Sequence, residues 1–197
     1  MPKKDDPRKL GEMIKDAPFR HLAKRHNIRR MRSDVFIWLK NFTIKLTKTF
    51  IGYSINAMKD YGENNTTLTL RDFNTYSLEP YVNANEAPVS PVRCKISSPK
   101  KDNFPILNRR GCVYIPISVF KTMLDRIMNT YFKGYTIEKA AQDKIHWFIE
   151  RYLWSLLRGC AMLLDYSGLK TLSIKELEVA ERHLDAYRYM TISTRDS

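Results

Sequence analysis

Cysteine and glycine are scarce in this chain of 197 residues, and both shortages exclude classes of protein. The three cysteines, Cys94, Cys112 and Cys160, form no CxxC pair, which argues against a disulfide scaffold and favours a reducing compartment. The seven glycines form no phosphate-cradling loop, and neither a His/Cys metal cluster nor a Ser-His-Asp arrangement stands out. We therefore expect a protein that is not an enzyme and that has no cofactor and no metal site.

A long hydrophobic run is also missing. The most apolar long stretch, residues 35–58, is interrupted by Lys40, Lys45 and Lys48, so it falls short of the ~18 consecutive apolar residues of a membrane span. The opening MPKKDDPRKL is charged and contains no apolar segment of a secretory signal. We expect no membrane association, and a composition with 43% hydrophobic and 12% aromatic residues is sufficient for a folded core.

Positive charge is abundant and unevenly distributed, and the net charge is +13. Residues 1–75 contain 16 Lys or Arg against 8 Asp or Glu, whereas residues 116–197 contain 12 against 10. The densest run, residues 17–33, contains six basic residues and no acidic one. Such a cluster predicts an anionic partner, of which nucleic acid is the most common, followed by an acidic protein or a membrane surface.

One seven-residue pattern occurs twice, as TLTLRDF at residues 67–73 and as TLSIKEL at residues 171–177. The third residue of each motif carries a hydroxyl and the sixth a carboxylate, which is the spacing of a capping box at the start of a helix. Each motif therefore predicts a short extended segment followed at once by a helix, over roughly 70–77 and 174–188.

Long amphipathic stretches precede both motifs. Apolar residues recur every three to four positions across 34–61 and across 137–165, which predicts two helices of seven or eight turns. Shorter amphipathic stretches come before them at 17–26 and 117–130. Between the two copies, residues 78–115 contain five prolines and predict an irregular connector. The pattern predicts an all-α fold built as an internal repeat of short helix, long helix, motif and last helix.

The first copy resembles histone four, and the second resembles histone three. HLAKRHNIRRM at residues 21–31 follows the histone-four run of aliphatic and basic residues, and TLTLRDF matches that family's second loop. From Phe120, FKTMLDRIMNTYFKGYTIEKAAQDKIHWFIERYLWSLL is similar to histone three, and TLSIKELEVA matches its second loop and final helix. Histone four ahead of histone three in one chain resembles the fused histone doublets of large double-stranded DNA viruses.

The resemblance implies two histone folds with short, long and short helices, paired within one chain as a handshake pseudo-dimer. The implied divisions are a short N-terminal tail (1–16), a histone-four-like fold (17–77), a proline-rich connector (78–115), a histone-three-like fold (116–190) and a C-terminal tail (191–197).

The resemblance also implies DNA contacts at the paired loops and helix starts. Arg30 matches the histone-four arginine that enters the minor groove, and Thr67 and Thr171 match second-loop threonines close to DNA. Thr136 stands where histone three has its first-loop arginine, and Lys133 and Lys139 are close enough to replace that arginine in part. Asn64, Asn65 and Thr66 stand where histone four has a basic triplet, so that contact is expected to be weaker. The expected DNA-binding residues are Arg20, Lys24, Arg25, Arg29, Arg30, Arg32, Thr67, Arg109, Arg110, Lys133, Lys139, Lys170 and Thr171.

The implied function is that of a viral doublet histone that wraps double-stranded DNA to package a genome, in the virion and in the host nucleus or viral factory. Its implied partners are a second doublet resembling histones two-B and two-A, and another copy of itself through a four-helix bundle formed at Glu176, Val179 and Arg182. Two alternatives stay open. The modest charge of the second copy favours a histone-fold transcription-regulator subunit, and the basic patch alone fits a non-packaging helical adaptor.

Overall fold

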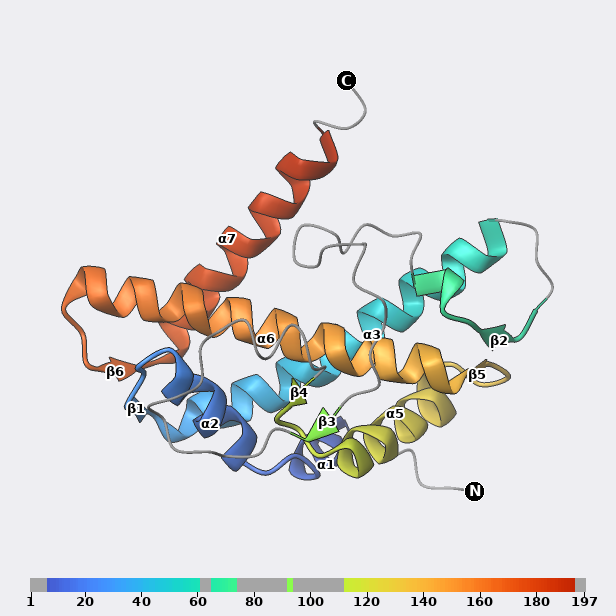
Figure 1. Cartoon of the computed structure of the whole chain (residues 1–197), viewed down its shortest axis with the longest axis horizontal. Coiled ribbons are helices and arrows are strands. Elements are labelled where there is room, and N and C mark those ends of the chain that lie inside the picture. The colour runs from blue at the N-terminus through green and yellow to red at the C-terminus, as the bar shows by residue number, and fades with distance from the viewer. Residues whose placement is uncertain (1–6, 61–64, 74–91, 94–111, 194–197) are drawn as a thin grey trace.

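The structure is a computed structural model that describes residues 7–60, 65–73, 92–93 and 112–193, and these are mostly helical (Figure 1). The helices are α1 (Pro7–Glu12), α2 (Ala17–Arg25), α3 (Ser33–Asp60), α5 (Ile117–Tyr131), α6 (Lys139–Ser167) and α7 (Ile174–Ser193), with a short 3-10 turn η1 (Arg71–Phe73). The strands are β1 (Arg30–Met31), β2 (Thr67–Leu68), β3 (Val92–Arg93), β4 (Cys112–Val113), β5 (Thr136–Ile137) and β6 (Thr171–Leu172). Within the described ranges, none of the helices has the length and apolar character needed to cross a membrane.

The helices predicted from hydrophobic periodicity are confirmed. α2, α3, α5 and α6 lie within about two residues of the predicted ranges, and α7 extends to Ser193 instead of ending near 188. In the first copy, only the turn η1 of the predicted last helix is described, and the rest of that helix lies outside the described residues. The all-α prediction therefore holds for the part of the chain that the structure describes.

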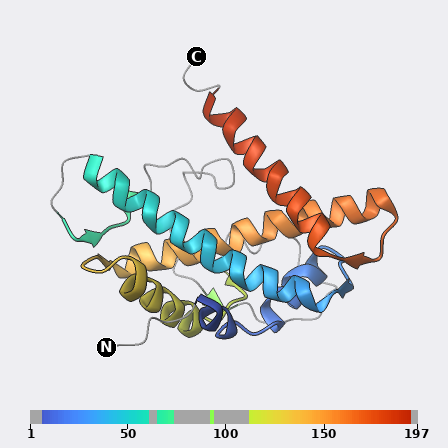
Figure 2. The ribbon, with the colours of Figure 1, turned by 180° about the vertical axis from the view of Figure 1, so that it is seen from behind.

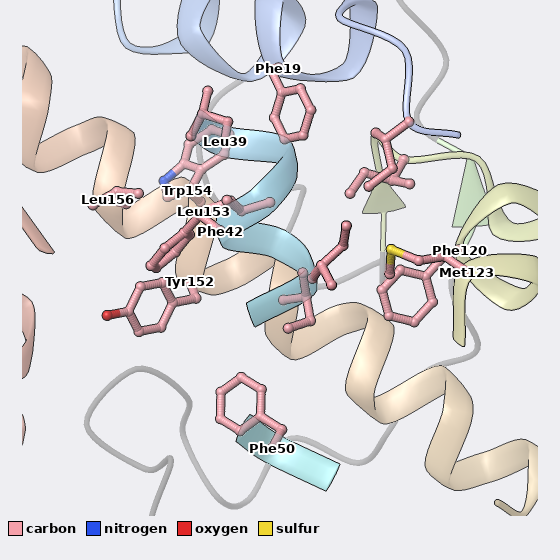
Figure 3. Close-up of a cluster of buried hydrophobic side chains, with 14 of the residues drawn as sticks. Phe19, Leu39, Phe42, Phe50, Phe120, Met123, Tyr152, Leu153, Trp154 and Leu156 are labelled. Atoms are coloured by element: carbon pink, nitrogen blue, oxygen red, sulfur yellow. The ribbon is translucent and has the colours of Figure 1, made fainter. Parts of the chain in front are cut away.

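The core lies where the two long helices, α3 and α6, cross each other (Figures 1 and 2). Figure 3 shows that this cluster draws side chains from four helices: Leu39, Phe42 and Phe50 of α3, Tyr152, Leu153, Trp154 and Leu156 of α6, Phe19 of α2, and Phe120 and Met123 of α5. Because one apolar cluster joins side chains of both copies of the repeat, neither long helix buries its apolar face without the other copy.

Two short parallel strand pairs connect the copies, one at each end of the long helices (Figure 1). β1 pairs with β6, and β2 pairs with β5. The register places Arg30 opposite Thr171 and Met31 opposite Leu172 in the first pair, and Thr67 opposite Thr136 and Leu68 opposite Ile137 in the second. Each repeated motif therefore pairs with the segment that precedes the long helix of the other copy.

Half of each predicted capping box forms, and it lies within the motif: the acid bonds back to the cap residue, while the hydroxyl bonds to the acid instead of to a backbone N–H. The backbone N–H of Thr69 donates to Asp72 Oδ2 at 2.6 Å, and that of Ser173 donates to Glu176 Oε2 at 2.9 Å. The hydroxyls of Thr69 and Ser173 bond to the same carboxylates, so each motif ends in a closed local network. These two carboxylates therefore fix the angle between each strand and the helical turn that follows it.

Part of the segment expected as an N-terminal tail is folded. Residues Pro7–Glu12 form α1, which packs on α3, and the side chains of Leu10 and Ile14 are fully buried. Asp16 Oδ1 lies 2.7 Å from Lys40 Nζ of α3, which fixes the end of this segment. Two apolar residues inside a charged stretch are enough to anchor it, because each buries its whole side chain against the core.

The replacement Leu10→Ala is expected to lower the free energy of unfolding by about 2 kcal/mol, at the low end of the range for buried leucines because a terminal helix can detach locally. Urea denaturation followed by circular dichroism measures this loss. Lys15→Ala, at an exposed position of the same segment, is the matched control and should change stability by less than about 0.5 kcal/mol. Equal stabilities for the two variants would show that α1 does not contribute to the core.

The end of the proline-rich connector is also anchored. β4 pairs in parallel with β3, and Val113 and Ile115 are buried. Glu150 of α6, itself buried, accepts hydrogen bonds at Oε1 from the backbone N–H groups of Tyr114 (2.9 Å) and Ile115 (2.6 Å). A buried carboxyl group therefore ties the last residues before α5 to the long helix of the second copy.

This carboxyl group makes stability depend on pH. Burial raises the pKa of Glu150 to about 8, and burial lowers the pKa of the neighbouring His146 to about 3. Between pH 4.5 and 8 the folded chain holds a proton on Glu150 that the unfolded chain has released, so the stability due to Glu150 falls as pH rises through this window. His146 acts in the opposite direction and only below pH 6.5, because the unfolded chain takes up the proton there.

Glu150→Gln keeps an oxygen acceptor for the two backbone N–H groups and carries no charge. The variant should therefore be increasingly more stable than the parent protein as pH rises from 5 to 8.5. Urea denaturation at a series of pH values measures this gap, and Glu138→Gln, at an exposed carboxylate, is the control with no such trend. Parallel stability profiles for Glu150→Gln and the parent would contradict the assignment.

Candidate nucleic-acid interface

Two left-handed turns deliver the segments that meet at the β1–β6 end. α2 is followed by Asn27, whose φ is 61°, and the N–H of Ile28 donates to the carbonyl of Ala23. α6 is followed by Gly168, whose φ is 68°, and the N–H of Leu169 donates to the carbonyl of Leu164. Both hydrogen bonds are typical of a helix C-terminus that ends in a left-handed residue. In both places the chain turns away from the helix and leads into a strand.

The residues around this strand pair form a cationic surface. Arg29, Arg30 and Arg32 of the first copy are exposed, as are Lys170 and Thr171 of the second. Arg32 lies 3.5 Å from Asp34, and among the residues that the structure describes neither Arg30 nor Lys170 has an ion-pair partner. We define these five residues as the β1–β6 surface. It places four cations beside a threonine hydroxyl, and it unites expected site residues that lie about 140 positions apart in the sequence.

Basic residues of α2 occupy different positions. Arg20 is exposed, and its guanidinium lies 4.4 Å from the centroid of the Phe36 ring; Lys24 is also exposed. Arg25 is half-buried, and its Nε donates to the hydroxyl of Tyr114 at 3.2 Å. Its placement is that of a residue joining α2 to the end of the connector, and the sequence contained no signal for this long-range contact.

The β2–β5 end carries a different set of polar and charged groups. The hydroxyls of Thr67 and Thr136 lie 2.9 Å apart and are exposed. Lys133 and Lys139 are exposed on either side of β5, and the exposed carboxylate of Glu138 sits directly before α6. Arg71 of η1, three residues after the end of β2, is also exposed, so this end has three cations and one acid beside its strands. The β1–β6 end has four cations, three of them arginines in or next to β1, with Asp34 and Asp165 close by. The expected contacts Arg109 and Arg110 lie outside the described residues.

The residues expected for self-association lie on the first turns of α7. Glu176 is engaged with Ser173, Val179 is half-buried, and the exposed Arg182 donates from Nε to the carbonyl of Glu178 at 3.3 Å. α7 packs on α6 (Figure 2), and α6 exposes two large apolar side chains one turn apart, Met162 (65% exposed) and Tyr166 (95% exposed). Neither residue was among those predicted for self-association, although the four-residue spacing places both on one side of the helix.

No model of a known protein family matches the sequence, and no curated protein matches it. In the described ranges, no group of three or more His, Cys, Asp or Glu side chains is arranged to hold a metal ion. What the chain does must therefore be inferred from its own geometry and sequence.

Proposed function

We propose that this protein is a doublet of two paired histone folds, histone-four-like then histone-three-like, that binds and wraps double-stranded DNA to package a viral genome. The observation that carries the proposal is the pair of parallel strand contacts, each joining the loop before one long helix to the repeated motif after the other. This exchange is what a handshake between two histone folds requires. A tether between the two halves would favour their pairing, since linkage raises the effective concentration to ~mM.

The chemistry of the β1–β6 surface supports DNA as the ligand. α3 and α7 both begin within two residues of this strand pair, so the N-termini of two helices lie beside its cations. Helix N-termini favour phosphate groups through their unpaired N–H groups and the helix dipole. An arginine at the position of Arg30 can enter the minor groove while the neighbouring cations contact the backbone.

The unequal ends predict unequal contacts with the duplex. The β1–β6 surface would hold the DNA through four cations, whereas the β2–β5 end offers three, Arg71, Lys133 and Lys139, with the hydroxyl pair of Thr67 and Thr136. DNA would therefore detach first from the β2–β5 end as salt is raised, because each lost phosphate contact costs affinity in a salt-dependent way.

A packaging particle needs further subunits. The proposal includes a second doublet resembling histones two-B and two-A, and self-association through the histone-three-like half at Glu176, Val179 and Arg182. The exposed side chains of Met162 and Tyr166 support that surface, because large apolar groups on a helix next to a polar rim are typical of a protein contact. The virion and the host nucleus or viral factory are the proposed locations.

Nuclease digestion tests the packaging proposal. Particles reconstituted from this chain, DNA and a doublet of the two-B and two-A type should protect a fragment of roughly 120–150 bp. A featureless digest would contradict wrapping, while DNA retention on a filter in the same experiment would show whether simple binding survives.

One observation favours a second candidate, a histone-fold subunit of a transcription regulator that binds DNA locally. The β2–β5 end carries Glu138 and no arginine in β5, which suits a short contact better than a continuous wrap. Such a protein would bind duplex DNA without compacting it at stoichiometric coverage. Compaction that is lost steeply as salt rises would reject this candidate.

A further inference from the structure

A half-open hollow of about 380 Å³ lies between the turn after α2 and the C-terminal end of α6. Its volume is within the range of small-molecule sites. The hollow has an apolar wall formed by Ile28, Ala161, Leu164 and Leu169. Leu169 is half exposed within it, which leaves apolar surface available to a ligand.

The charged part of the lining is mixed. Arg29, Arg30 and Lys170 contribute three cations, which suit a phosphate group. Asp165, an exposed carboxylate, also lines the hollow and is out of place in a site for a purely anionic ligand. A carboxylate accepts hydrogen bonds only, so Asp165 suits a ligand that also presents donors such as hydroxyl groups.

Two further residues complete the lining. Asn27, held with a φ of 61° by the turn after α2, offers a side-chain amide that can both donate to and accept from the edge of a base. Burial, helped by the charge of Arg158, lowers the pKa of His26 to about 4, so its ring is neutral near pH 7. His26 therefore adds a flat, uncharged surface to the wall and no repulsion against a cation or a base.

We propose that this hollow binds a free ribonucleoside phosphate. The phosphate would lie among Arg29, Arg30 and Lys170, the ribose hydroxyls would donate to Asp165, and the base would cover the apolar wall beside Asn27. This proposed nucleotide site does not depend on the proposed packaging function. It shares three cations with the β1–β6 surface, so a bound nucleotide would compete with DNA for that surface.

Calorimetric titration of the full chain with AMP, dAMP, adenosine and ribose 5-phosphate tests the proposal, each probe removing one recognised group. AMP should bind saturably, one per chain, and dAMP should bind about tenfold more weakly, because a lost hydrogen bond to a charged group costs about that factor. Asp165→Asn should reduce the ratio between AMP and dAMP, and Leu169→Ser should weaken AMP binding several-fold. Leu169→Ser should leave the affinity for duplex DNA within about twofold, because Leu169 is uncharged and lies outside the β1–β6 surface. Asp165→Asn should raise that affinity slightly, because it removes a negative charge beside the three cations.

Equal affinity for AMP and ribose 5-phosphate, or an AMP affinity unchanged by Leu169→Ser, would overturn the proposal. Either result would mean that the protein recognises only the phosphate group and that the base does not contact the apolar wall. Absence of saturable AMP binding at millimolar concentration would also overturn it. AMP binding in a chain that fails to bind duplex DNA would support the hollow and reject the packaging function instead. Binding of both, with AMP displacing DNA, would support the two proposals together.

Discussion

Simultaneous replacement of Arg29, Arg30 and Lys170 by alanine is expected to weaken binding of duplex DNA by a factor of about 10² or more at moderate salt. These three exposed cations come from both copies and lie together only because β1 pairs with β6. Each phosphate contact releases about one counterion, so the slope of log affinity against log salt should fall by about 2 to 3. Fluorescence anisotropy with a labelled duplex, measured at several salt concentrations, gives both quantities.

The control removes the same charge elsewhere. Lys15, Lys121 and Arg126 are exposed and lie outside both strand pairs. Alanine at these three positions should leave the salt slope nearly unchanged and lower affinity only slightly, through the smaller net charge. If both triple variants lose affinity equally, DNA is attracted by overall charge, and the β1–β6 surface is not a defined contact.

Leu153→Ala is expected to lower the free energy of unfolding by about 3 to 4 kcal/mol. Leu153 is fully buried at the crossing of α3 and α6 (Figure 3), and truncation there leaves a cavity that rigid neighbouring helices cannot fill. Because side chains of both copies share this cluster, the whole chain should still unfold in one transition at lower urea.

Urea denaturation followed by both circular dichroism and tryptophan fluorescence measures this change. Asn129→Ala, at an exposed position of α5, is the control and should cost less than about 0.5 kcal/mol. The contradicting result is two separate unfolding transitions, of which Leu153→Ala shifts only one. The two copies would then fold independently and would not share one core.

Much of the fold could be predicted from hydrophobic periodicity. α3 and α6 carry apolar residues at three-to-four spacing over seven turns or more, a signal that few alternatives produce. The N-terminal helix α1 was missed because its packing depends on two buried residues, Leu10 and Ile14, inside a charged segment. The two-residue strands have no periodicity of their own, and their partners are set by the crossing of the long helices.

Part of the candidate site could also be predicted from the sequence. Exposed cations such as Arg30 and Lys170 follow from charge and from their position beside helix ends. The engagement of Arg25 with Tyr114 could not be predicted, because it joins residues 89 positions apart. The hollow beside Asp165 likewise exists only once the turn after α2 meets the end of α6. Long-range contacts of this kind leave no local pattern in the sequence.

Site-specific photo-crosslinking tests most directly the claim that the β1–β6 surface faces DNA. A photoreactive amino acid at Thr171, opposite Arg30, should crosslink to duplex DNA in high yield, and the same group at Thr136 should crosslink less. At Ile117, an exposed position outside both strand pairs, it should give only background. Equal yields at Thr171 and Ile117 would contradict the account, because DNA would then have no preferred face on the protein.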